Sequence, residues 1–139
     1  MNKKLSFDTF TVTGKRKRAL AKATIKSGSG KIKMNLRPIE FLSVMRRLYI
    51  QEPIRLVEGA GMPINFDISV KVTGGGPEGQ VEAARLAIAR SIVKFAKSPE
   101  IRKIFLNYDR NMMIQDTRRK EDYKPNDSKA RAARQKSYR

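Results

Sequence analysis

Histidine and cysteine are both absent from this 139-residue chain, so most of the side chains that could do chemistry are cations. The chain therefore lacks the usual near-neutral acid–base group, the thiolate nucleophile and the commonest metal ligands. Ser-His-Asp and Cys-His mechanisms are excluded, and no metal or cofactor site is predicted. The carboxylates Asp109 and Asp116 stand beside arginines in a polar, basic stretch. We interpret them as charge pairs that orient the end of the chain, not as a catalytic pair.

The charge balance indicates a polyanionic partner. Lysine and arginine total 31 against 13 acidic residues, which gives a net charge of +18 and a pI near 10.7. A compact chain with so much like charge repels itself, and each phosphate it neutralises releases counterions, so nucleic acid is the first candidate. An acidic membrane surface is the second. No apolar run approaches the roughly 18 residues that span a bilayer, and no secretory signal is recognised, so an intracellular protein is expected.

Four consecutive cations follow Gly14, namely Lys15, Arg16, Lys17 and Arg18. At this overall charge we interpret them as phosphate contacts, which fix a protein on a nucleic-acid backbone without reading bases. A solvated cluster and a localisation signal remain as alternatives.

A triple glycine, residues 74–76, precedes a predicted helix start. Backbone N–H groups at a helix N-terminus can hold a phosphate. A nucleotide-binding loop would continue Gly-Lys-Ser/Thr, whereas this chain continues Pro77-Glu78-Gly79-Gln80. Nucleotide hydrolysis is therefore not predicted. Two alternatives stay open: a tight strand-to-helix turn alone, and a turn that also meets an RNA backbone.

The last part of the chain has a composition of its own. Residues 117–139 hold nine basic and three acidic residues, with Tyr123 and Tyr138 as the large apolar groups. Such a segment cannot bury enough surface to fold alone. The chain length suits one domain with an appendage, so we expect a body over residues 1–116 and an extended basic tail over 117–139.

Strands and helices must position these groups in the body. Period-two alternation predicts strands over Ala19–Ile25 and Lys31–Met34, joined as a hairpin by the turn signal at Ser27–Gly30. The clearest predicted strand is Phe66–Thr73.

The helical pattern predicts short helices over Ile39–Leu48 and Ile54–Gly59, separated by Pro53. A long helix is predicted from about residue 78 to 97, and another opens at Pro99. The fold class is a small α/β or α+β body with helices on one sheet face. The predicted core positions on these helices are Leu42, Met45, Leu48, Val81, Ala84, Ile88, Ile92 and Phe95.

These motifs resemble, in order and spacing, the universal ribosomal protein S-nine family of the small subunit, from Thr13 to Arg139. The densest matching block runs from Gly74 to Arg90. The segment Glu52-Pro53 and the tail are similar to the archaeal and eukaryotic branch, and the short N-terminus favours the archaeal one. Pro77-Glu78 departs from the family pattern. The other matching residues are Gly14, Lys15, Arg16, Lys17, Ala19, Ala21, Gly28, Gly30, Asn35, Pro38, Asp67, Ile68, Val70, Val72, Tyr108, Asp109, Arg110, Asp116, Arg118, Arg119, Lys120, Glu121, Gln135, Lys136, Ser137 and Tyr138.

The resemblance implies a ribosomal protein S5 domain 2-like fold and a structural, non-enzymatic role in the head of the cytoplasmic small subunit. It implies ribosomal RNA and neighbouring head proteins as partners, with no cofactor, membrane or homo-oligomer. It also implies that the tail approaches the anticodon stem-loop of the P-site transfer RNA, with Arg139 as the main contact. The predicted transfer-RNA-binding residues are Lys136, Ser137, Tyr138 and Arg139. The predicted ribosomal-RNA-binding residues are Lys15, Arg16, Lys17, Arg18, Gly75, Gly76, Arg90, Lys94, Arg110, Arg118, Arg119, Lys120, Lys129, Arg131 and Arg134.

Two other functions are compatible with parts of the sequence. A general basic nucleic-acid binder, such as a chromatin protein, would bind duplex DNA as tightly as subunit RNA. An RNA-processing enzyme on a related small fold is disfavoured by the lack of histidine and of a clustered carboxylate pocket.

Overall fold

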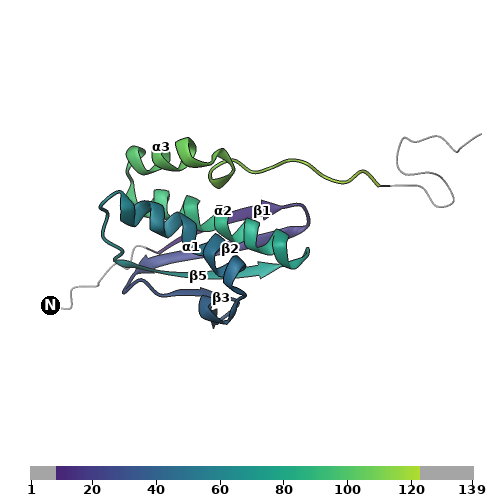
Figure 1. The fold of residues 1–139 in the computed structure, drawn as a ribbon, viewed down its shortest axis with the longest axis horizontal. Helices are drawn as coiled ribbons and strands as arrows, with labels where there is room; N and C mark the ends of the chain where they lie inside the picture. Colours follow the sequence, from purple (N-terminus) through teal and green to yellow (C-terminus); the bar gives the residue numbers. More distant parts are fainter. Residues whose placement is uncertain (1–8, 123–139) are drawn as a thin grey trace, which may run out of the picture.

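Five strands and three α-helices make up residues 9–122, the part of the chain that the computed structural model describes (Figure 1). The mixed α/β fold predicted from the sequence, with helices on one face of a small sheet, is confirmed. In chain order the elements are β1 Phe10–Arg16, β2 Ala19–Ser27, β3 Ile32–Met34, β4 Arg37–Pro38, the 3-10 helix η1 Ile39–Phe41, α1 Val44–Gly59, β5 Phe66–Thr73, α2 Pro77–Ala96, α3 Pro99–Tyr108 and the 3-10 helix η2 Arg110–Met112.

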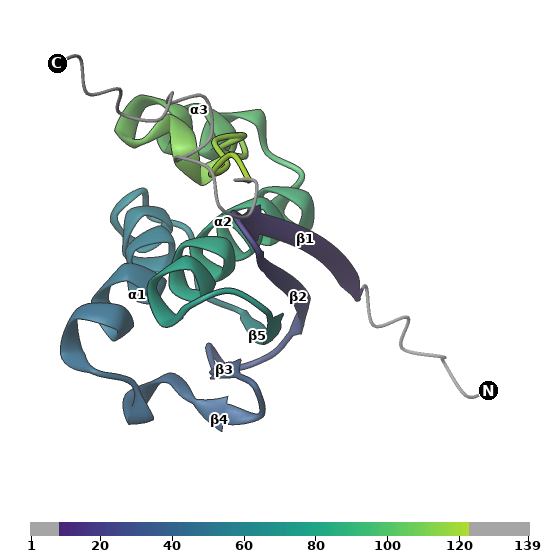
Figure 2. The same cartoon turned by 90° about the vertical axis from the view of Figure 1, so that its right-hand side faces the viewer.

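The strand order is β1-β2-β5-β3-β4, with β3 and β5 parallel and the other neighbours antiparallel (Figure 2). The predicted hairpin between β2 and β3 is therefore wrong, because β5 lies between these strands. The Asp67 carboxylate on β5 accepts the backbone N–H groups of Ser29 and Lys31, both at 2.9 Å, and so fastens the loop between β2 and β3 to β5. The hairpins that do form join β1 to β2 and β3 to β4.

The sheet and α2 approach each other closely because small residues face each other there. Ala19, Ala21 and Ala23 on β2 are fully buried. On β1, a Cβ at Gly14 would collide with the carbonyl oxygen of Ala83 and lie 2.8 Å from the backbone nitrogen of Ala87. This close contact identifies β1, which the sequence pattern did not predict, as a strand beneath α2.

The predicted stripe of α2 is largely confirmed, since Val81, Ala84, Ile88 and Ile92 are buried. Phe95 is half-buried, and its ring packs edge-on against Phe66 at 5.8 Å between centroids. These large side chains fill the end of the core farther from Gly14.

Helix α1 is continuous where the sequence predicted two short helices. Pro53 lies buried inside it, between the buried side chains of Ile50 and Ile54. Proline inside a helix costs about 3 kcal/mol, and burial of this face against α2 offsets that cost. Met45 and Leu48, predicted to face the core, are 71% and 38% exposed.

Arg85 on α2 is the centre of a charge network that joins three helices. Its Nε lies 2.6 Å from Glu52 Oε2 on α1, as an ion pair without a directed hydrogen bond, and its Nη1 donates to Asp109 Oδ2 at 2.8 Å. The Tyr108 hydroxyl at the end of α3 donates to the other Glu52 oxygen at 2.6 Å. The three charged side chains are between 14% and 27% exposed, so the network fixes α1 and α3 against α2.

We expect Arg85→Met to lower the free energy of unfolding by about 2 kcal/mol, because Glu52 and Asp109 would keep their charges without their partner. Urea unfolding followed by circular dichroism measures this change. Arg102→Met on the exposed side of α3 is the matched control and should stay within about 0.5 kcal/mol of the wild type. An Arg85→Met protein as stable as the control would contradict the role assigned to this network.

Candidate nucleic-acid interface

The hairpin turn between β1 and β2 presents two of the predicted cations at one end of the sheet. Lys17 and Arg18 form the turn and are exposed. Lys17 has a φ of 52°, a left-handed conformation that costs a residue with a Cβ about 1–2 kcal/mol. A lysine therefore occupies a position where glycine would be more stable.

The glycine loop after β5 lies directly against this turn. Gly74 and Gly75 have φ values of 70° and 67°, and a Cβ at Gly74 would lie 2.7 Å from the carbonyl oxygen of Arg18. A Cβ at Gly75 would lie 2.8 Å from the backbone nitrogen of Ala19. The tight turn that both alternatives share is thus confirmed, and the loop and the cationic turn form one surface. RNA contact at Gly75 and at the exposed Gly76 stays a prediction.

Arg16 differs from its neighbours in the cationic run, because its side chain lies on the helix-covered side of the sheet. It pairs with Glu82 on α2 through Nε and with Asp116 through Nη1. Asp116 also accepts the backbone N–H and the guanidinium of Arg118, at 2.8 and 2.7 Å. The predicted charge pairing around Asp116 is therefore present, and it attaches the start of the C-terminal segment to the cationic turn.

The pKa values reflect this arrangement. The side-chain hydrogen bond to Glu82, with Asp116 adding to it, raises the pKa of the Arg16 guanidinium. Hydrogen bonds from Arg118 and then from Arg16 hold the pKa of the Asp116 carboxyl far below its ordinary value of 3.8. Arg16 and Asp116 therefore both stay charged throughout the neutral range.

The other predicted cations of the body are spread over the molecule. Arg90 donates to the backbone carbonyls of Met113, at 3.0 Å, and Thr13, at 3.2 Å, so it holds the chain after α3 against β1. Lys94 lies near the end of α2, with its Nζ 5.5 Å from the centre of the Phe10 ring. This position is at the opposite end of β1 from the turn.

Arg110 is exposed on η2, and Arg119 and Lys120 are exposed on the segment that leaves the body. The remaining predicted site residues lie outside the described part of the chain: Lys129, Arg131, Arg134, Lys136, Ser137, Tyr138 and Arg139.

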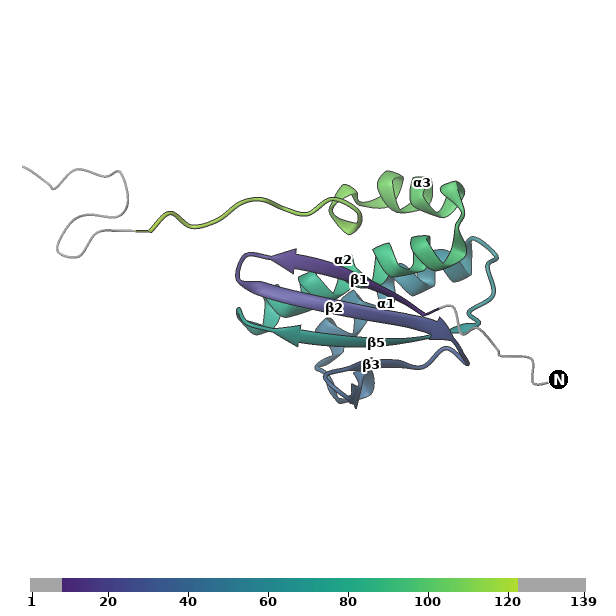
Figure 3. The ribbon, with the colours of Figure 1, turned by 180° about the vertical axis from the view of Figure 1, so that it is seen from behind.

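One cationic surface was not predicted. Lys22 on β2, Lys33 on β3 and Lys71 on β5 lie on the sheet face opposite the helices (Figure 3). In the sequence, these lysines are the polar residues that alternate with the buried ones. They could be recognised as one surface only after the strand order showed that they lie next to one another.

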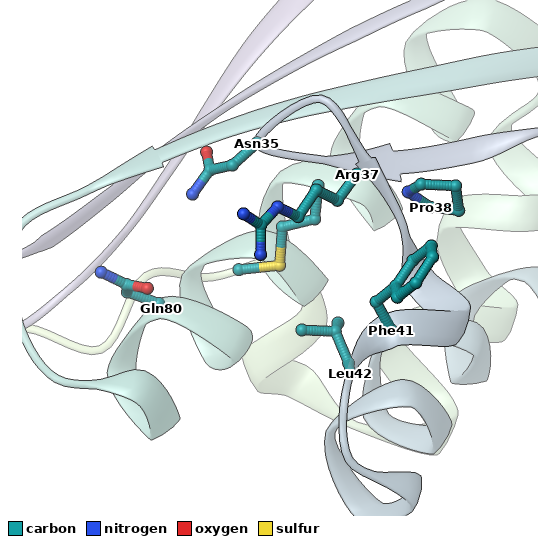
Figure 4. Close-up of a pocket in the computed structure, with 7 residues that line it drawn as sticks. Asn35, Arg37, Pro38, Phe41, Leu42 and Gln80 are labelled. Atoms are coloured by element: carbon teal, nitrogen blue, oxygen red, sulfur yellow. The ribbon is translucent and has the colours of Figure 1, made fainter.

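The pocket shown in Figure 4 lies between η1, the turn after β3 and the first turn of α2 and has a volume of about 440 Å³. Arg37 and Gln80 supply its polar side chains beside Asn35. Within residues 9–122, no group of three or more acidic residues is placed to hold a metal ion. None of the helices there is long and apolar enough to cross a membrane.

A small α/β body that gathers cations at one sheet end and on one open sheet face is characteristic of structural proteins that assemble with nucleic acid. Comparison with known proteins gives the family within this class.

Residues 14–139 match the family described as "Ribosomal protein S9/S16". The Small ribosomal subunit protein uS9 of Thermoplasma volcanium is 46% identical over 133 residues, which cover 95% of this chain and 99% of that protein. The uS9 of Methanococcus maripaludis is 43% identical over 129 residues, covering 91% and 95%.

The chain belongs to this ribosomal protein family, in its archaeal branch, as the sequence motifs predicted. It is a structural, non-enzymatic protein of the small ribosomal subunit, and the predicted cytoplasmic location follows from this membership.

We expect Asp116→Asn to lower the thermal unfolding midpoint at pH 7, with a deficit that shrinks at low pH. Because the arginines depress the pKa of Asp116, its carboxylate adds stability above the ordinary value of 3.8 and loses it as the pH falls through the folded value. Midpoints measured from pH 2 to 7 test this. Glu58→Gln, at an exposed site on α1, is the control and should not share this pH-dependent deficit. A constant deficit for Asp116→Asn would contradict the electrostatic origin.

Proposed function

We propose that the chain binds small-subunit ribosomal RNA through the cationic turn and glycine loop and contacts P-site transfer RNA through the end of its tail. Neighbouring proteins of the subunit head are further partners, and each subunit holds a single copy. The body fixes the position of the protein on the RNA, because cations at its turn contact phosphates without reading bases. The tail contributes the contact with transfer RNA.

The single observation that carries this proposal is the attachment of the chain at Asp116. Through Arg16, this residue is tied to the end of the sheet where Lys17 and Arg18 are exposed. The following residues, up to 122, run away from the sheet and helices (Figure 1). A body bound to RNA by its turn would therefore start the tail from the bound surface. We place the division between body, 1–116, and tail, 117–139, at this attachment.

The length of the tail suits a contact with a second RNA. Residues 117–139 are 23 residues, and a chain of this length spans at most about 80 Å when fully extended. Nine of them are basic, so the segment can follow phosphates along its length and order on RNA as it binds. The planar guanidinium of Arg139 is suited to a phosphate contact.

The predicted RNA-binding cations of the body divide between two roles. The guanidinium of Arg16 already meets two carboxylates, and that of Arg90 meets two backbone carbonyls. We assign both to holding the body together and the first phosphate contacts to Lys17 and Arg18. If the chain were a general basic nucleic-acid binder, such as a chromatin protein, duplex DNA would bind as tightly as subunit RNA at the same salt concentration. We expect subunit RNA to bind more tightly in a competition assay.

Deletion of Ser137, Tyr138 and Arg139 should leave subunit assembly intact and weaken P-site transfer RNA. The deletion removes three of the four predicted contact residues, including Arg139, while the rest of the tail keeps its charge. Filter binding of transfer RNA to purified subunits measures the effect, and Lys129→Gln is a control that removes one tail charge upstream. Equal affinity in wild-type and truncated subunits would show that the end of the tail makes no contact.

Lys17→Gly should raise the free energy of unfolding by about 1 kcal/mol, because it removes the left-handed strain. It should also weaken ribosomal RNA binding and reduce the slope of log affinity against log salt by about 0.7–0.9, the value of one phosphate contact. Lys17→Ala is the matched control, since it loses the same charge and keeps the strain. If neither variant changes the slope, this lysine is merely solvated.

A further inference from the structure

The face of the sheet away from the helices is open, and apart from the exposed Leu20 near the start of β2 its middle strands present polar side chains. Figure 3 shows strands β1, β2, β5 and β3 on this side with α1 and α2 behind them. Every second residue of β2 and β5 is buried on the helix side, and the residues between them point outward. In the part of the chain that the structure describes, no helix or loop covers these outward positions.

Like charges stand opposite each other in the middle of this face. Lys22 on β2 and Lys71 on β5 are direct cross-strand partners, and both are exposed. Lys33 on β3 is paired with Ser69, two residues before Lys71 on the same strand, so it is the diagonal neighbour of that lysine. Directly opposed like charges destabilise a sheet. The arrangement therefore works against the stability of the isolated protein.

The acid on this face does not neutralise these lysines. Among the outward residues of the described strands, Asp67 is the one carboxylate. It accepts the backbone N–H groups of Ser29 and Lys31, which hold its pKa below the ordinary value. Within the described strands, no carboxylate is the cross-strand partner of Lys22 or Lys71.

The other outward residues indicate what kind of anion fits. Hydroxyl side chains adjoin the lysines: Thr13 is the cross-strand neighbour of Lys22, and Thr24 lies opposite Ser69. Hydroxyls and ammonium groups both donate to phosphate oxygens. The described strands carry no aromatic side chain on this face, so it has no platform on which bases could stack.

We propose that this open sheet face, defined by Lys22, Lys33 and Lys71 with Thr13 and Thr24, is a docking surface for the sugar–phosphate backbone of RNA. The lysines contact separate phosphates through their flexible stems, and the threonines donate hydrogen bonds between them. The surface reads charge and shape and is indifferent to base sequence. The inference rests on the ribosomal RNA binding proposed above and adds to it a second contact area.

The test is the salt dependence of binding between the full-length chain and a transcript of the small-subunit RNA head. The variant is Lys22→Gln with Lys71→Gln. The matched control is Arg102→Gln with Lys103→Gln, which removes two exposed charges from α3. We expect the sheet variant to reduce the log–log slope by about 1.4–1.8, the loss of two phosphate contacts, and the control to leave it near the wild-type value.

Thermal unfolding of the free protein separates lost contacts from misfolding. The sheet variant should melt at or above the wild-type midpoint, because it relieves the repulsion between opposed lysines. An unchanged slope, or an equal fall in the control, would overturn the assignment. If the sheet variant keeps the wild-type slope but is poorly incorporated into subunits, the assignment is also overturned, because that result would indicate that a protein and not RNA contacts this face. If even the wild type fails to bind the transcript, ribosomal RNA binding itself is wrong.

Discussion

The close approach of α2 to β1 at Gly14 is the constraint on which the rest of the structure depends. The glycine leaves no side chain between the strand and the backbone of Ala83, so α2 lies against the sheet along the alanines of β2. From this position Glu82 reaches Arg16, and Arg85 reaches both α1 and the end of α3. Because all helices gather on this side, the other sheet face stays open for a partner.

Arginines and lysines have different places in this molecule, which explains how a chain of charge +18 folds. Arg16, Arg85 and Arg90 are half-buried, and each guanidinium meets two oxygen acceptors of the protein. Planar forks suit such bidentate pairing. Lys22 and Lys71 instead point outward from the sheet. The net charge therefore overstates the number of cations that can contact RNA, because some arginines are paired within the protein, where they fix the helices and the start of the C-terminal segment.

The local elements could be predicted from the sequence where one segment carries its own pattern. Strand Phe66–Thr73 alternates without exception and was predicted with its observed bounds. The strand order could not be predicted, because the second partner strand of β2, β5, pairs through residues 39 to 53 positions further along the chain. Helix α1 was divided at Pro53, since only its tertiary packing shows why the helix continues there. In the candidate site, the run Lys15–Arg18 was predicted from its charge, but the strand face of each residue was not, so the ion pairs of Arg16 with Glu82 and Asp116 could not be predicted.

The insertion of β5 between β2 and β3 has a consequence for the protein's own synthesis. When β1 and β2 have left the exit tunnel as a hairpin, the second edge of β2 has no partner until Thr73 has been made. An unpaired strand edge is a template for aggregation, and outward lysines are a common protection against it. The exposed Lys22 and Lys26 place charges on β2 during this interval, the kind of side chain by which natural edge strands disfavour pairing with other chains.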